Sequence, residues 1–232
     1  MTEPIDISLP IGPGLMTWPG HPRAEVRPLQ RLAEGDGADV SELRISSHAG
    51  THIDPPRHMI EGGTGIDQIP LGALIGPCWV ADATGRGGAL GADDLDSLQV
   101  PAGADRLLLR TDNSDLWASA TVEFPEEYVC LAPEGARWIV DRGIRLVGTD
   151  FLGIEQRGAA GHPAHVELLS HGVTIVEGLN LGHVEAGAYV LTVLPLRVVD
   201  GDGGPARAVL VREPPAGSIS ADVGASDPRA PG

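Results

Sequence analysis

Short apolar segments bounded by glycine, proline or aspartate recur along the chain, and their length and β-branched content are typical of strands. The last two segments are separated by Asp200-Gly-Asp-Gly-Gly, a sequence that indicates a hairpin or a loop. From this pattern we expect strands at residues 5–9, 40–46, 78–82, 106–110, 146–149, 173–176, 188–197 and 206–211.

Helical patterns are fewer and shorter, and we expect helices at residues 92–97, 132–142 and 165–170. Pro133 just inside the second helix and Gly143 after it suit the usual start and end of a helix. The order strand, helix, strand occurs twice in the second half of the chain, which indicates parallel pairing, whereas hairpin-like pairs near both ends indicate antiparallel pairing. The pattern therefore predicts a mixed α/β fold with few helices and layered sheets.

Composition supports one folded domain. The 232 residues include 32 glycines and 20 prolines, yet 42% of residues are hydrophobic and fall in organised runs. We expect a single domain over residues 1–212, and a Pro/Gly-rich tail over 213–232 that offers no apolar face to bury. Cys78 and Cys130 form no Cys-x-x-Cys pattern, so we expect two buried apolar thiols.

The charge balance narrows the class of partner. The chain has 32 acidic and 16 basic residues, a formal net charge of −16, and such a surface repels both nucleic acid and anionic membranes. Residues 1–30 show no basic start followed by an apolar core, and no run is long enough to span a bilayer. We therefore expect a cytoplasmic protein that handles small molecules.

The most chemically loaded segment is residues 48–58, with the sequence HAGTHIDPPRH. Two prolines exclude a regular helix, and in an extended run His52 and Asp54 share one face because they are two residues apart. Gly50 allows the backbone to bend and bring His48 to the same point. Imidazole and carboxylate groups are preferred ligands of zinc and are accepted by manganese, so the segment predicts a metal site, with His58 close by.

Two other interpretations of this segment stay open. The histidines and the aspartate can be ordinary turn and capping residues in a protein that binds a ligand without an ion. The metal can instead be structural, in a domain that acts as a non-catalytic scaffold. A structural site is normally closed by four ligands, however, and has no use for His58 four residues further on.

A catalytic site needs ligands from a second segment, and residues 162–177 supply the candidates. His165 opens a predicted helix and Glu177 ends a strongly apolar strand, where a carboxylate has little structural use and where α/β proteins tend to place their sites. Helix and strand can thus deliver both side chains to one cavity. His162 and His171 are nearby, but we assign them no role beyond the surface or the surroundings of the site.

Residues 48–58 match His-x-Gly-Thr-His-x-Asp-x-Pro-x-His at every fixed position, and this motif resembles the signature of the cyclase family of metal-dependent hydrolases, which includes bacterial kynurenine formamidases. Further similarity spans about residues 4–200. It is carried by Asp6-Ile-Ser-Leu-Pro, Trp18-Pro19-Gly20, residues 64–71, Val147-Gly-Thr-Asp150 and residues 173–179.

The resemblance implies a swivelling β/β/α fold, an assembly of two or more copies, and a role for each matching residue. His48, His52 and Asp54 would hold one metal, and Asp54 would bridge to a second metal held by His165 and Glu177. His58 would be the general acid/base. Trp18 corresponds to a tryptophan that contacts substrate in the formamidases.

The implied reaction is hydrolysis of an amide, with N-formylkynurenine as the expected substrate, through a water activated by one or two divalent ions. Zinc is the expected ion, and manganese accepts the same ligands. Hydrolysis of a cyclic amide such as isatin or of a lactone, and a cyclase role in secondary metabolism, stay open as alternatives. Two features keep these alternatives open. Only 3% of residues are aromatic, whereas an aryl substrate needs an apolar, usually aromatic-lined pocket, and His21 stands where family members often carry an acidic residue.

Overall fold

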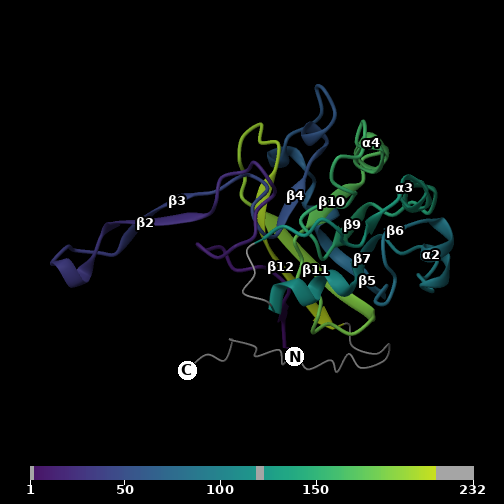
Figure 1. The fold of residues 1–232 in the computed structure, drawn as a ribbon, viewed down its shortest axis with the longest axis horizontal. Coiled ribbons are helices and arrows are strands. Elements are labelled where there is room, and N and C mark those ends of the chain that lie inside the picture. Colours follow the sequence, from purple (N-terminus) through teal and green to yellow (C-terminus); the bar gives the residue numbers. More distant parts are fainter. Residues whose placement is uncertain (1–2, 119–122, 213–232) are drawn as a thin grey trace, which may run out of the picture.

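The computed structural model describes residues 3–118 and 123–212 (Figure 1). The predicted tail at 213–232 lies outside the described residues, so its separation from a single domain at 1–212 stays a prediction. Within the described residues, no helix has both the length and the apolar character needed to cross a membrane.

One sheet of eight strands forms the centre of the molecule, in the order β1, β12, β11, β5, β7, β9, β10, β4. β4 also pairs with β12, so that the sheet closes on itself in a barrel-like manner. The strands are β1 (Ile5–Asp6), β4 (His52–Asp54), β5 (Ile75–Asp82), β7 (Arg106–Arg110), β9 (Leu146–Thr149), β10 (Thr174–Glu177), β11 (Gly187–Pro195) and β12 (Gly204–Arg212).

Both kinds of pairing occur in this sheet. β5, β7, β9 and β10 run parallel to their neighbours among these four strands. β4, β11, β12 and β1 pair in the antiparallel direction. The predicted mixed α/β class with parallel and antiparallel portions is therefore confirmed.

Helices cover one face of the parallel strands (Figure 1). They are α2 (Ala92–Ser97), α3 (Pro133–Asp141) and α4 (Pro163–Ser170), whereas the short α1 (Leu71–Leu74) packs with β5 and β11 in the other core. The 3-10 turns are Leu32–Glu34, Pro56–His58, Ile66–Gln68 and Asp112–Ala118. Alternate residues of β7 serve two cores, because Leu107 and Leu109 pack in the cluster with α2, α3 and α4 whereas Leu108 packs in a second cluster with β11 and β12. Burial on both faces explains why the parallel strands are continuous apolar runs.

Two small sheets lie outside the main one. β6 (Ala89–Leu90) pairs with β8 (Cys130–Leu131), and β2 (Glu25–Gln30) pairs with β3 (Val40–Arg44). The β2–β3 ribbon extends away from the rest of the fold (Figure 1), and every residue in its two strands is exposed. The chain leaves this ribbon on the segment that leads to His48.

Most predicted elements are present. The strands at 106–110 and 146–149 and the helix at 92–97 have the predicted bounds, and the other predicted elements differ mainly at their ends. The strand expected at 5–9 is shorter, since only Ile5–Asp6 pairs regularly with β12. β2, β4, β6 and β8 were not predicted as strands, because each is short or interrupted by polar residues or proline.

Candidate metal centre

Two neighbouring strands carry three of the predicted ligands. β4 runs antiparallel to β10, and the register places His52 opposite Glu177. His52 Nε2 lies 3.4 Å from Glu177 Oε2 and 3.5 Å from Asp54 Oδ1. All three side chains are buried, and two carboxylates at this depth are costly unless positive charge compensates them. The extended segment thus places His52 and Asp54 on one face, as its spacing predicts.

Two glycines allow these strands to approach closely. Gly50 has a φ of 61° and Gly178 a φ of 68°, a left-handed conformation that favours glycine. A Cβ on Gly178 would lie 2.2 Å from the Gly50 carbonyl oxygen. The Thr51 hydroxyl donates to the Gly178 carbonyl over 2.5 Å and accepts from the Leu9 amide over 2.8 Å. The backbone therefore fixes the separation of the two ligand-bearing segments.

The loop around β4 supplies two further histidines. His48 Nδ1 donates to Asp54 Oδ1 over 2.8 Å. His58 ends the 3-10 turn Pro56–His58, and its ring centroid lies 4.1 Å from that of His48 and 5.8 Å from that of His165. The bend at Gly50 thus brings His48 back to Asp54, and the His58 ring lies against the His48 ring.

The remaining predicted ligand comes from the first turn of α4. His165 Nε2 lies 3.4 Å from Glu177 Oε1 and 3.7 Å from Asp54 Oδ2. Its other ring nitrogen, Nδ1, donates to Glu155 Oε1 over 2.8 Å. The same oxygen accepts from His162 Nδ1 over 2.9 Å. Because Glu155 holds Nδ1, the Nε2 atom of His165 faces the two buried carboxylates.

Two buried atoms at the centre lack a hydrogen-bond partner within the described residues, namely His52 Nε2 and Asp54 Oδ2. His52 Nδ1 donates to the Gly50 carbonyl over 2.8 Å, which leaves the lone pair of Nε2 directed at the carboxylates. Unsatisfied buried polar atoms are rare, and a lone pair beside carboxylate oxygens is the donor set of a divalent cation. The residues present therefore fit a metal ion.

Within residues 3–118 and 123–212, three groups of side chains bring ligand atoms within 4.8 Å of one another. Asp54 belongs to two of them, once with His48 and His58 and once with His52 and Glu177. The third group contains Glu155, His162 and His165. Asp54 thus has the central position that a bridging ligand requires.

The charges in this centre are strongly coupled. Burial disfavours the protonated form of His48, but the carboxylate of Asp54 outweighs it and raises the pKa of His48 to about 9. Burial is likewise outweighed at His165, where Glu155 and Glu177 raise the pKa to about 10. Burial alone would raise the pKa of Asp54 and of Glu177, yet the surrounding histidines hold both below their ordinary values. Without an ion, protons on the histidines supply the positive charge that the carboxylates need.

His58 behaves differently from the other histidines of the centre. Burial lowers its pKa, and the nearby charge of Asp54 only partly offsets this effect. A histidine with a lowered pKa is neutral at pH 7 and can accept a proton.

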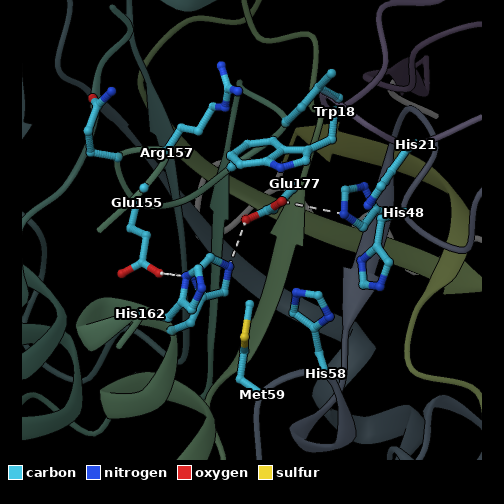
Figure 2. A pocket seen from close by; sticks show the side chains of 15 residues that line it. Trp18, His21, His48, His58, Met59, Glu155, Arg157, His162 and Glu177 are labelled. Atoms are coloured by element: carbon cyan, nitrogen blue, oxygen red, sulfur yellow. Dashed lines mark hydrogen bonds and ion pairs between the residues drawn. The ribbon is translucent and has the colours of Figure 1, made fainter. Parts of the chain in front are cut away.

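An open cavity leads to these side chains, and small-molecule sites are concave in this way. In the view of Figure 2, Trp18 and Arg157 lie on one side of Glu177, and His58 and Met59 lie on the other. The Trp18 ring is held by an edge contact with Phe124, at 4.9 Å between centroids. The cavity can therefore admit a flat apolar group beside the candidate metal ligands.

The structure brings the predicted site residues together. Apart from Asp54, which lies beneath them, they all line this cavity: Trp18, His48, His52, His58, His165 and Glu177. His21 and His162 line it as well, whereas His171 is exposed and donates from Nδ1 to the Glu167 carbonyl. The role assigned to each residue stays a prediction.

Sequence reasoning missed three polar residues around the centre. Glu155 and Arg157 follow β9 and line the cavity, and Asp202 Oδ2 lies 3.4 Å from His48 Nε2. The position of Glu155 beyond the carboxyl end of a parallel strand was a usable signal, because sites gather at this edge. No comparable signal marked Asp202.

Comparison with known proteins agrees with this geometry. Residues 5–156 match the family described as "Putative cyclase". The chain is 36% identical over 215 residues to a kynurenine formamidase from Erythrobacter litoralis, which covers 91% of this chain and 95% of that protein. A solved structure of a potential metal-dependent hydrolase with cyclase activity matches with a TM-score of 0.79 at 36% identity, over 92% of this chain and all of that one.

Isatin hydrolase A from Labrenzia aggregata also matches, with a TM-score of 0.78 at 25% identity over 91% of this chain and 94% of that one. The resemblance seen in the HAGTHIDPPRH motif is therefore confirmed over most of the described fold. The chain belongs to the cyclase family.

Proposed function

We propose that this protein is a metal-dependent hydrolase that cleaves the formamide C–N bond of an aryl formamide, with N-formylkynurenine as its substrate. The observation that carries the proposal is the pair of unsatisfied buried atoms, His52 Nε2 and Asp54 Oδ2, beneath an open cavity. The kynurenine formamidase from Erythrobacter litoralis, 36% identical to this chain, supports the choice of substrate.

The metal ligands in this proposal are His48, His52, Asp54, His165 and Glu177, with Asp54 shared when two ions are bound. Imidazole nitrogens make up more than half of this set, which favours zinc over manganese. When bound, the cation supplies Lewis-acid activation of the attacking water and of the carbonyl oxygen.

His58 moves the proton in the proposed reaction. Water adds to the formyl carbon, and the neutral imidazole of His58 takes one of its protons. The same proton passes to the leaving nitrogen as the C–N bond breaks, so that formic acid, which loses the second water proton to become formate, and an arylamine are the products. His58 lies beside the ligand set and lines the cavity that would hold the substrate.

Trp18 positions the aromatic ring of the substrate in this proposal. Its indole packs against Gly153, where a Cβ would lie 2.5 Å from Trp18 Cζ3. Glycine at this position leaves room for the edge of the indole at the cavity wall, and an apolar indole suits an aryl ring.

The direct test is hydrolysis of N-formylkynurenine by the purified protein, with zinc or manganese supplied and then removed by a chelator. The proposal expects metal-dependent release of formate at a rate well above that with isatin or simple lactones. Bound metal without hydrolysis of any amide or lactone would instead support a scaffold, and a protein that takes up no metal would refute the proposal.

Ring opening of a cyclic amide is the second candidate. It is favoured by the match to isatin hydrolase A from Labrenzia aggregata. It is also favoured by the small number of aromatic residues on the cavity wall, where Trp18 is the one aromatic residue, apart from the histidines, in the described part of the chain. Faster turnover of isatin than of N-formylkynurenine in the same assay would select this candidate.

We also propose that the protein forms a homodimer or a larger homo-oligomer. The β2–β3 ribbon supports this proposal, because its two faces differ. One face carries the cross-strand ion pairs Arg27–Glu42 and Glu25–Arg44. The other face carries the opposed apolar pair Val26 and Leu43, and both side chains are about half exposed. An isolated two-stranded ribbon is marginal in water. Light scattering after gel filtration tests the proposal, and a monomer at micromolar concentration would contradict it.

A further inference from the structure

Among the described residues that line the cavity, Arg157 is the one permanently positive side chain. It lies on the same side of Glu177 as Trp18 in the view of Figure 2, and both residues line the cavity. Arg157 is exposed to solvent although it lines the cavity.

The guanidinium of Arg157 forms no ion pair or side-chain hydrogen bond with any residue in the described part of the chain, although acidic residues outnumber basic ones by 32 to 16. Most arginines of this chain pair with an acid, as Arg145 does with Asp105 over 2.7 Å. The acids of the cavity are occupied elsewhere, because Glu155 accepts from His165 and Glu177 accepts from the Ile154 amide. The five donors of Arg157 are therefore available to a ligand.

The backbone at Arg157 is fixed even though its side chain is free. The Arg157 amide donates to the Tyr128 hydroxyl over 2.6 Å, and that hydroxyl donates to the Glu155 carbonyl over 2.8 Å. Gln156 adds a hydrogen bond to the Glu126 carbonyl over 3.2 Å. A free cationic end on a fixed backbone is an arrangement suited to a ligand-binding residue, because only the side-chain rotamers must be ordered on binding.

The net charge of −16 disfavours the approach of a substrate carboxylate unless a local cation offsets it. Guanidinium binds a carboxylate through two parallel hydrogen bonds. We propose that Arg157 binds the carboxylate of an aryl formamide while the formyl group lies at the metal ligands, and so sets the preference for amino-acid or benzoate formamides over amides without a carboxylate. The inference rests on the proposed function and names the residue that selects its substrate.

The test compares Arg157→Gln with the unaltered, metal-loaded enzyme on N-formylkynurenine, on its methyl ester and on formanilide. Losing a charge-assisted contact lowers kcat/KM for N-formylkynurenine by about 10-fold to 100-fold, chiefly through KM. Formanilide is neutral and lacks the carboxylate, so its kcat/KM changes less than about twofold. The methyl ester keeps the ammonium group but not the carboxylate, so loss of the positive Arg157 side chain does not lower its kcat/KM. Arg157→Lys keeps the charge without the paired donors and is expected to recover part of the loss.

Arg197→Gln is the matched control, because Arg197 is also exposed and, within residues 3–118 and 123–212, its guanidinium has no ion pair. It is absent from the cavity lining, and this variant should resemble the unaltered enzyme on all three substrates. An equal effect of Arg157→Gln on the acid and its ester, or no effect on either, would overturn the assignment. Absence of turnover with formanilide and N-formylkynurenine in the unaltered enzyme would instead refute the proposed function.

Discussion

Replacement of Glu155 by glutamine tests how the candidate centre holds its ligands. Glu155 Oε1 accepts from His165 over 2.8 Å and from His162 over 2.9 Å, and Oε2 accepts from the Ala164 amide over 2.9 Å. A carboxamide has one oxygen and cannot accept at both positions. If its oxygen faces the histidines, its NH₂ group opposes the Ala164 amide. If it is reversed, the NH₂ group opposes His165 Nδ1 and shifts the proton to the nitrogen that should face the metal.

Either orientation removes a charge-assisted hydrogen bond from a candidate metal ligand. Residues that orient ligands in this way typically change metal affinity by about 10-fold to 100-fold, which corresponds to about 1.4–2.7 kcal/mol. We therefore expect Glu155→Gln to bind zinc more weakly by this factor. Glu155 also helps to raise the pKa of His165 to about 10. Zinc must displace this proton from the unaltered protein at pH 7, whereas it displaces fewer protons from the variant. The difference in zinc affinity between the two proteins should therefore grow as the pH approaches 10.

The assay is zinc competition against a chelating indicator at several pH values, with circular dichroism to confirm that the variant is folded. His162→Ala is the control, because it removes one partner of Oε1 and leaves the His165–Glu155 bond. The control should bind zinc within about threefold of the unaltered protein, because the His162 side chain is half exposed. Zinc affinity of Glu155→Gln within twofold of the unaltered protein at every pH would refute the reasoning.

Four further predictions concern the same centre. His58→Ala should keep its metal and lose about 100-fold to 10,000-fold in kcat, as measured by elemental analysis beside the formamide assay, whereas loss of metal would make His58 a ligand. Asp54→Ala should lose the metal, because Asp54 belongs to two of the three candidate groups, and a variant with full metal content would disprove the bridging role. Gly153→Ala should displace the indole of Trp18, whose Cζ3 would lie 2.5 Å from the new Cβ, and raise KM severalfold with little change in kcat; an unchanged KM would remove Trp18 from the substrate site. His48 and His165, with pKa values of about 9 and about 10, are protonated at pH 7 in the metal-free protein. Zinc binding should therefore release protons, and the metal-free protein should lose stability as the pH rises from about 6.5 through these values. Heats of zinc binding that are the same in buffers of different ionisation enthalpy would contradict the release of protons.

The parallel strands were predicted well from the sequence, because a short strand that is buried on both faces is a continuous run of apolar residues. The strands at 106–110 and 146–149 show this directly. β2 escaped prediction for the opposite reason, since its residues are all exposed and include Pro28. A ribbon that buries nothing leaves no hydrophobic period to detect.

The candidate ligands were predictable because residue type and spacing carry their chemistry. Two histidines and an aspartate within residues 48–54 have few other uses, and resemblance to the cyclase family added the pairing with His165 and Glu177. Glu155 and Asp202 could not be found in this way, because one glutamate or aspartate in a loop is chemically ordinary until folding places it beside a histidine.

β4 lies between β10 and β12, and both of those strands come from the last quarter of the described chain. The segment that carries His52 and Asp54 is therefore synthesised early but finds its neighbours late, across about 120 to 150 residues of chain. Pairings between such distant segments form slowly. During synthesis, the HAGTHIDPPRH segment consequently leaves the ribosome long before the strands that surround it. Nearly all of the barrel must be synthesised before this segment can enclose a metal ion.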